Sequence, residues 1–247
     1  MTKLPDLTWT RSRDFRAGPF CATPVRPSDW TALAHALAAG RLTLLSLWAE
    51  DGAACMALHD SETRRVAVAR VDAAKGAFPS VGVHHAPAQR LERAAADLFG
   101  LVPEGAQDTR PWLDHGRWGI KHPLGDAAPQ AAQPPYPFLP VEGDSLHQVP
   151  VGPVHAGIIE PGHFRFTAQG ETVVRLEERL GYTHKGIDLL MRGASLARGA
   201  ELAGRSSGDS TVAYSVAFAQ AAEAALSVAV PRRAFALRGL MAELERL

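Results

Sequence analysis

The proline-dense segment that begins at Pro123 is the feature that most limits how this chain can fold. Six prolines fall between Pro123 and Pro140 in a chain of 247 residues. Proline fixes its own backbone angle, lacks a backbone donor and pushes the preceding residue towards extended backbone. Neither a helix nor a central strand can therefore run through this segment. The sequence predicts two separately folded parts, residues 1–122 and 146–247, joined by an extended linker over residues 123–145.

The composition excludes two classes of direct partner. Lysine plus arginine and aspartate plus glutamate number 26 each, so the balanced charge offers no attraction to nucleic acid. The longest apolar run is far shorter than the about 20 residues that a membrane-spanning helix needs. The first residues lack an apolar signal segment, so we expect a cytoplasmic protein that reaches a membrane only through partners. Cys21 and Cys55 have no metal-type spacing and are expected to be small buried side chains.

The first part has the pattern of an α/β domain. A helix is predicted over residues 30–37, capped by Ser28 or Asp29 and ended by Gly40. Strand-like runs follow at 42–48, 53–59 and 65–71. The turn sequence at residues 50–52 joins the first two runs, which predicts one antiparallel sheet with a helix on one face.

A second helix is predicted over residues 87–100, with proline in its first turn and glycine at its end. Its apolar stripe consists of Leu91, Ala94, Ala95, Leu98 and Phe99. Glu92, Arg93 and Asp97 are expected on the other faces of the helix. Residues 105–118 then form a polar segment with several aromatic side chains, which suits either a docking surface or a solvated loop.

The second part begins with a bent loop that is rich in chemically active side chains. Residues 152–166 contain His155, Glu160 and His163 together with two prolines and three glycines. A strand at 146–151 precedes the loop, and alternating residues around Gly170 predict a β-hairpin after it. The loop would then hold His155 and Glu160 on one side of a small sheet. An ordinary turn-rich loop with scattered polar residues is the alternative.

Helices dominate the rest of the second part. Short helical stretches are predicted over 176–190, interrupted by Gly181 and Gly186, followed by helices at 196–202, 212–229 and 231–247. The last of these has no stop signal, so we expect the chain to be a fragment of a longer protein. The predicted fold class is α+β: an α/β domain with an antiparallel sheet, the proline-rich linker, and a small sheet leading into a mainly helical domain.

The first part resembles a subunit of respiratory complex I. Four spaced motifs carry the resemblance: Leu91-Glu92-Arg93, Asp97-Leu98-Phe99-Gly100, Gly105, and Asp108-Thr109-Arg110. In this order they are similar to the subunit known as the thirty-kilodalton type. The resemblance covers residues 28–120 and implies a scaffold that docks onto quinone-module subunits and binds no cofactor itself.

The second part resembles the large subunit of membrane-bound, energy-converting nickel–iron hydrogenases. The motifs that carry this resemblance are Gly152-Pro153-Val154-His155, Glu160-Pro161-Gly162-His163-Phe164, Gly170-Glu171-Thr172-Val173, Leu176-Glu177-Glu178-Arg179-Leu180-Gly181-Tyr182 and His184-Lys185-Gly186. The forty-nine-kilodalton subunit of complex I is the more distant relative, because it lacks the Glu-Pro-Gly-His motif. A domain of the thirty-kilodalton type fused to such a large subunit is the arrangement of formate-hydrogenlyase-type enzymes.

One departure from the hydrogenase pattern affects the expected cofactor. The family places two cysteines in its next motif, where this chain has Ser207 and Ser210. A serine hydroxyl is a hard, protonated donor and does not replace a soft bridging thiolate. We therefore expect no nickel–iron centre and no other cofactor in this chain, with a [4Fe–4S] cluster in a partner subunit. The second cysteine pair of the family would lie beyond Leu247.

The resemblance assigns roles to the polar residues. Glu160 matches the glutamate that relays protons in hydrogenases, and a buried carboxyl there would have a raised pKa. His155 matches the first histidine of the complex I quinone loop, but Ile159 replaces the histidine that contacts quinone. The candidate catalytic residues are His155, Glu160, His163, Arg205 and Asp209. Arg205 and Asp209 are expected to form an ion pair over the cavity, unless Asp209 is only a helix cap.

Two classes of function follow from these residues. The first is a redox subunit of a membrane-attached, NADH–quinone-oxidoreductase-like complex, which passes electrons from iron–sulfur clusters to a quinone-like or unknown acceptor and couples this to proton or ion movement. The second is a non-catalytic scaffold that only assembles partners. A true nickel hydrogenase is the third. The expected partners are a small iron–sulfur subunit and membrane-embedded subunits on the inner face of the cell membrane.

Overall fold

The computed structural model describes residues 5–11, 20–131, 134–154 and 160–247. The chain divides into two compact units. The first comprises residues 1–111, 118–131 and 220–229, and the second comprises 112–117, 132–219 and 230–247. The predicted domain and linker boundaries stay predictions. Across the described ranges, no helix combines the length and apolar character needed to cross a membrane.

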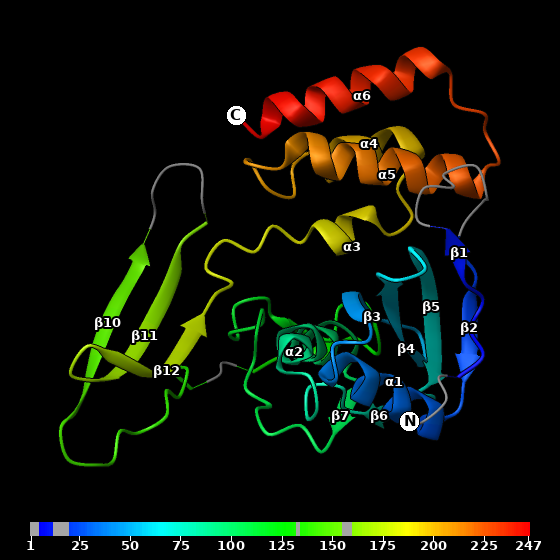
Figure 1. Ribbon diagram of the computed structural model, residues 1–247. Helices are drawn as coiled ribbons and strands as arrows, with labels where there is room; N and C mark the ends of the chain where they lie inside the picture. The colour runs from blue at the N-terminus through cyan, green and yellow to red at the C-terminus, as the bar shows by residue number, and fades with distance from the viewer. Residues whose placement is uncertain (1–4, 12–19, 132–133, 155–159) are drawn as a thin grey trace. The chain divides into compact units, whose positions relative to one another are not determined.

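The first unit is built on a five-stranded sheet (Figure 1). Its strands are β1 (Thr10–Arg11), β2 (Ala22–Val25), β3 (Thr43–Glu50), β4 (Ala53–Asp60) and β5 (Arg65–Asp72). The β3, β4 and β5 strands are antiparallel neighbours, which confirms the three predicted strands, and Gly52 makes the first turn with a φ of 67°. The sheet is not wholly antiparallel, because β2 pairs with β5 in parallel.

Two helices, α1 (Pro27–Ala38) and α2 (Gln89–Phe99), pack against this sheet. The core consists mainly of Trp30, Leu33 and Leu37 from α1, with Met56, Leu58 and Val71 from the strands. The predicted cap is wrong: Arg26 is the N-cap residue, and its guanidinium forms an ion pair with Asp29 at 2.9 Å. Pro27 supplies the start of the helix because its fixed φ suits the first turn.

Short elements complete the first unit. They are β6 (Ala77–Pro79), β7 (Val102–Glu104), β8 (Ile120–Lys121), β9 (Ala128–Pro129) and the single-turn helix η1 (Ala86–Ala88). The β6 and β7 strands are parallel, and β8 and β9 are antiparallel. The expectation that both cysteines are buried is half wrong: Cys55 is buried, but Cys21 is exposed. Burial raises the pKa of the Cys55 thiol to about 12.

The second unit begins with a three-stranded antiparallel sheet of β10 (Leu146–Val154), β11 (Gly162–Gln169) and β12 (Thr172–Arg179) (Figure 1). The predicted hairpin is confirmed, and Gly170 turns it with a φ of 58°. The helical prediction is wrong for residues 176–179. This stretch continues β12 because its backbone pairs with β11 as far as the His163–Arg179 pair.

The apolar face of this sheet is partly exposed to solvent, and its polar face is covered. Val149, Phe166 and Leu176 lie side by side on one face, and Val149 and Leu176 are exposed. The opposite face carries rows of polar residues, including Arg165 paired with Glu177. Part of the proline-rich segment covers that polar face and contacts Arg165 and Glu177, whereas several apolar side chains of the other face are exposed to solvent.

Contacts of residues 138–140 show how the proline-rich segment is held. The Arg165 guanidinium lies 3.9 Å from the centroid of the Phe138 ring. The Leu139 amide donates to the Glu177 carboxylate at 3.0 Å, and Arg175 donates to the Leu139 carbonyl at 3.1 Å. The segment is therefore packed on the sheet, and it is more than an extended spacer.

Four helices follow: α3 (Ile187–Met191), α4 (Leu196–Ala203), α5 (Thr211–Ala225) and α6 (Arg232–Glu245). The last three confirm the predicted helices to within a few residues at each end. Close approach between α4 and α5 depends on Gly199, where an added Cβ would lie 2.6 Å from the Phe218 ring. The start of α5 is capped by α6, because the Glu245 carboxylate accepts hydrogen bonds from the Val212 and Ala213 amides.

We expect a truncated chain ending at Ala131 to unfold cooperatively by itself, because the buried apolar cluster of the first unit lies within residues 7–101. A chain ending at Pro123 should be less stable. It loses the hydrogen bond from the Leu124 amide to the Leu98 carbonyl and the packing of Gly125 against Phe99. Thermal unfolding followed by circular dichroism measures both. A broad, non-cooperative transition of the longer form would contradict an independent domain.

Candidate functional site

A cavity of about 310 Å³ in the second unit contains the sequence-predicted Glu160. Its walls come from residue 160, which lies two residues before β11, from the turn before α3, the first turn of α3, the loop before α5, and α5 itself. The lining residues are Glu160, Thr183, His184, Lys185, Gly186, Ile187, Asp188, Ser206 and Tyr214. The site therefore joins segments that are far apart in the sequence, and it mixes both signs of charge with hydroxyl groups.

Glu160 is held by two side chains of the turn before α3. The Lys185 ammonium lies 2.7 Å from the Glu160 carboxylate, and the Thr183 hydroxyl donates to the other carboxylate oxygen. Lys185 also donates to the carbonyls of Arg205 and Ser206, each at 3.4 Å. The expected burial of Glu160 is wrong for this chain, since 47% of its side chain is exposed. Glu160 lines this cavity, and its predicted place in a former active site stays a prediction.

Of the two predicted histidines, the structure describes His163, which does not line this cavity. His155 lies outside the described residues, as does Ile159. The His163 ring lies on the polar face of the sheet, where its centroid is 5.1 Å from that of Phe138. Its Nδ1 lies 3.2 Å from the Gly152 carbonyl oxygen. Of the residues predicted to be catalytic, Glu160 alone has its side chain among the described lining of this cavity.

The segment at the expected metal position does not fit a nickel–iron centre. The Ser207 hydroxyl donates a hydrogen bond to the Asp209 carboxylate, and a serine hydroxyl is a hard, protonated group that differs from the soft thiolate ligands of nickel. Asp209 thus pairs with Ser207 in place of the expected partner Arg205, whose side chain is exposed. The Ser210 carbonyl accepts from the Tyr214 amide in the first turn of α5.

Sequence reasoning gave no site role to the other lining residues, among them Thr183, Lys185 and Tyr214. Lys185 belongs to the His-Lys-Gly motif. Because helical stretches were predicted over residues 176–190, the sequence did not indicate that the Lys185 side chain reaches Glu160. The structure instead places it in a turn, where Gly186 has a φ of 67° and its amide donates to His184 Nδ1 at 3.2 Å. The sequence signal that could have identified Lys185 is a lysine that directly precedes a glycine and follows a polar strand.

In the first unit, two charged residues of α2 are buried although they lie off the apolar stripe of that helix. Glu92 is 1% exposed and Arg93 is 9% exposed. The Glu92 carboxylate accepts from the Val81 amide at 2.5 Å, the Gly82 amide at 3.2 Å and the Ser80 hydroxyl at 2.8 Å. Burial raises the pKa of Glu92, and these hydrogen bonds partly oppose the rise.

Arg93 fixes the segment that follows β7. It donates to the Arg110 carbonyl at 2.7 Å and the Pro111 carbonyl at 2.9 Å, and it forms an ion pair with Asp108 at 3.3 Å. Burial of Asp108 opposes its ionisation, but hydrogen bonds and charge from Arg110, together with Arg93, lower its pKa overall. The Leu-Glu-Arg and Asp-Thr-Arg motifs thus form one connected network, which explains their spacing.

Residues 23–134 match the family described as the 30 Kd subunit of respiratory-chain NADH dehydrogenase. The Glu92 and Arg93 network lies inside this range. This part of the chain is a domain of that family, and it is called the complex I-type domain from here on. The resemblance seen in the sequence over residues 28–120 is thereby confirmed.

Three relatives extend beyond the complex I-type domain. Hydrogenase-4 component G of Escherichia coli K12 is 35% identical over 74% of this chain and 35% of its own length. Formate hydrogenlyase subunit 5 of the same strain is 34% identical over 72% of this chain and 33% of its own length. The C/D subunit of NADH-quinone oxidoreductase from Bdellovibrio bacteriovorus is 29% identical over 72% of this chain and 34% of its own length.

The chain is homologous to these subunits of oxidoreductase complexes, and it spans about a third of their length. It is therefore a hydrogenase-like and complex I-like polypeptide, as the two resemblances in the sequence predicted. The loss of nickel ligands and the status of the chain as a fragment stay predictions.

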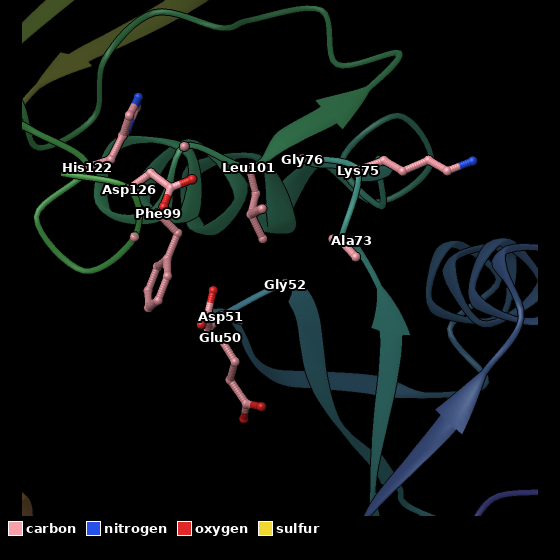
Figure 2. Close-up of a pocket in the computed structure, with 13 residues that line it drawn as sticks. Glu50, Asp51, Gly52, Ala73, Lys75, Gly76, Phe99, Leu101, His122 and Asp126 are labelled. Carbon is pink, nitrogen blue, oxygen red and sulfur yellow. The ribbon is translucent and has the colours of Figure 1, made fainter. Parts of the chain in front are cut away.

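The complex I-type domain has a larger cavity of its own, of about 450 Å³ (Figure 2). It lies between the end of α2 and the turn that joins β3 to β4. Phe99 extends towards Asp51, whereas the Lys75 side chain and the His122 ring point away from Asp51. Glu50 is already paired with Arg70 at 3.6 Å and accepts from the Trp48 indole at 3.2 Å. The polar groups do not converge on a common point, so we assign no chemistry to this cavity.

Proposed function

We propose that this chain is the hydrogenase-related subunit of a membrane-attached, complex I-like assembly and that it works without a nickel–iron centre. The observation that carries the proposal is the pair Ser207 and Ser210 at the thiolate positions, with the Ser207 hydroxyl donating to Asp209. A protonated oxygen engaged in this way is a poor ligand for nickel. Homology to hydrogenase and NADH-quinone oxidoreductase subunits supports the assembly.

The proposed role of the chain is to supply the place, beside a partner's iron–sulfur cluster, where electron transfer and proton transfer occur together. An iron–sulfur subunit delivers the electrons, and a quinone-like compound or another acceptor receives them. Glu160 moves protons at the cavity wall, because a carboxylate can both accept and donate a proton there. The complex I-type domain docks onto neighbouring subunits. Membrane-embedded partners would hold the chain at the cytoplasmic face of the membrane and couple turnover to proton or ion movement.

A scaffold that only assembles partners is the second candidate, and one observation favours it. Glu160 is half exposed and ion-paired with Lys185, which is also how a purely structural carboxylate is held. Turnover of the assembled complex distinguishes the two functions, because the scaffold tolerates neutralisation of Glu160. A true nickel hydrogenase would require thiolates where this chain has serines.

We expect the full-length protein, isolated with its partners, to contain iron and no stoichiometric nickel. The iron would belong to clusters of the partner subunit, since Ser207 and Ser210 replace the bridging thiolates. Elemental analysis by inductively coupled plasma mass spectrometry, with the iron–sulfur subunit confirmed by co-purification, measures this. One nickel per complex that is released only by unfolding would rule the proposal out.

A further inference from the structure

Lys185 has more partners than the ion pair with Glu160 requires. Its ammonium group carries three N–H donors. They have three acceptors in reach: the Glu160 carboxylate at 2.7 Å and the carbonyls of Arg205 and Ser206 at 3.4 Å. These acceptors come from two segments that are far apart in the sequence. One side chain therefore spans the cavity from the wall with Glu160 to the loop with the two serines.

The backbone around Lys185 aims the side chain at this position. Gly186 adopts left-handed backbone, with a φ of 67°, and caps the start of α3. Its amide donates to Nδ1 of His184, which closes the turn on the other side of Lys185. Thr183, in the same turn, donates to the second carboxylate oxygen of Glu160. Both oxygens of the carboxylate are thus held by one short segment.

We propose that Lys185 is the positioning residue for Glu160 in the reaction. This inference rests on the proposed function, in which Glu160 moves protons. The lysine holds the carboxylate against the Arg205–Ser206 loop, so that the proton-carrying group and that loop keep a constant separation. The other titratable groups that line the cavity are His184, Asp188 and Tyr214. Lys185 and Thr183 each bond one oxygen of the Glu160 carboxylate, and the lysine brings a positive charge to it.

Removing the ammonium group of Lys185 should slow turnover strongly, although it should change the folding stability of the chain little. The side chains of the pair are 41% and 47% exposed, and an ion pair this exposed contributes little to folding stability. A catalytic group displaced by about 1 Å can nevertheless lose about 10²-fold in rate. We expect Lys185→Met to lower turnover about 10²-fold with unchanged assembly, and Lys185→Arg to recover most of it.

The test uses the complete complex, purified through the tagged chain, with turnover measured across the acidic and alkaline limbs of its pH profile. The variants are Lys185→Met, Lys185→Arg, Glu160→Gln and the double variant Lys185→Met/Glu160→Gln. Arg198→Met is the matched control, because Arg198 forms a similarly exposed ion pair with Glu201 at 2.8 Å in the same unit. If Lys185 acts through Glu160, the double variant is no slower than Glu160→Gln. The acidic limb of the pH profile also moves to higher pH in Lys185→Met, because the stabilising positive charge is gone.

The outcomes separate this inference from the proposed function. Slow Glu160→Gln with full activity in Lys185→Met overturns the positioning role and leaves the proposed function in place. Full activity in Glu160→Gln overturns the proton-handling function itself. Additive losses in the double variant, or no rescue by Lys185→Arg, also overturn the positioning role. Where Lys185→Met fails to assemble, Lys185→Gln, which keeps two donors without the charge, is measured in its place.

Discussion

Glu160→Gln is expected to lower electron transfer by the assembled complex about 10²–10⁴-fold, the usual loss when a general acid or base is removed. Glutamine has nearly the same shape and can still accept from Thr183, but it cannot take up and release a proton. The position of Glu160 at the cavity wall beside Lys185 motivates the expectation. Donor-to-acceptor turnover of the purified complex, compared with the unaltered protein, is the measurement.

The matched control for this prediction is Glu171→Gln. Glu171 is an exposed carboxylate in the turn between β11 and β12, on the same sheet and away from the cavity lining. It should leave turnover unchanged. Assembly is checked in both variants by co-purification of the partner subunits. Normal turnover of an intact Glu160→Gln complex would make Glu160 a structural residue and would favour the scaffold function.

Glu92→Ala is expected to destabilise the complex I-type domain by about 3 kcal/mol or more, since each buried donor left without a partner costs about 1–3 kcal/mol. The change removes the acceptor of the Val81 amide, the Gly82 amide and the Ser80 hydroxyl in a buried position. Urea unfolding of the chain ending at Ala131 measures the loss, and Glu62→Ala, at an exposed position in the β4–β5 turn, is the control. Equal unfolding midpoints for both variants would contradict the role of the network.

The ionisation of Glu92 adds a pH dependence that the same measurement can detect. Its folded-state pKa is raised, so the folded domain binds a proton more tightly than the unfolded chain does. The contribution of Glu92 to stability therefore decreases as pH rises from the ordinary glutamate pKa through the raised value. Asp108 acts in the opposite direction, because its lowered pKa makes its contribution disappear as pH falls. The difference between the unaltered domain and Glu92→Gln isolates the Glu92 part, and a pH-independent difference would contradict it.

Local patterns were sufficient for the regular elements. The strands β3, β4 and β5 follow from β-rich runs separated by turn residues, and the end of α2 follows from Gly100, which adopts left-handed backbone with a φ of 76°. These features depend on neighbours in the sequence, which is why they could be predicted. The continuation of β12 to residue 179 could not be, because a polar stretch of strand is stabilised by pairing with β11 and by contacts with residues 138–140.

The candidate site was only partly predictable for the same physical reason. Helical periodicity places Glu92 and Arg93 away from the apolar stripe, but the partners that offset the cost of their burial come from residues 80–82 and 108–111. Such partners are supplied by other elements, and spacing within one helix carries no information about them. The position of Glu160 at a cavity was predicted from its motif, whereas its exposure and its ion pair with Lys185 were not.

The sequence by itself determined most of the helices and strands, the homology of the chain to complex I and hydrogenase subunits, and the chemistry of Ser207 and Ser210. Each of these depends on residue identity or on neighbours along the chain. Only the tertiary structure decided which charged groups are buried and which side chain holds Glu160. Lys185 reaches Glu160 from a different segment of the chain, and that contact exists only because the turn at Gly186 and the residues that lead into β11 are folded next to each other.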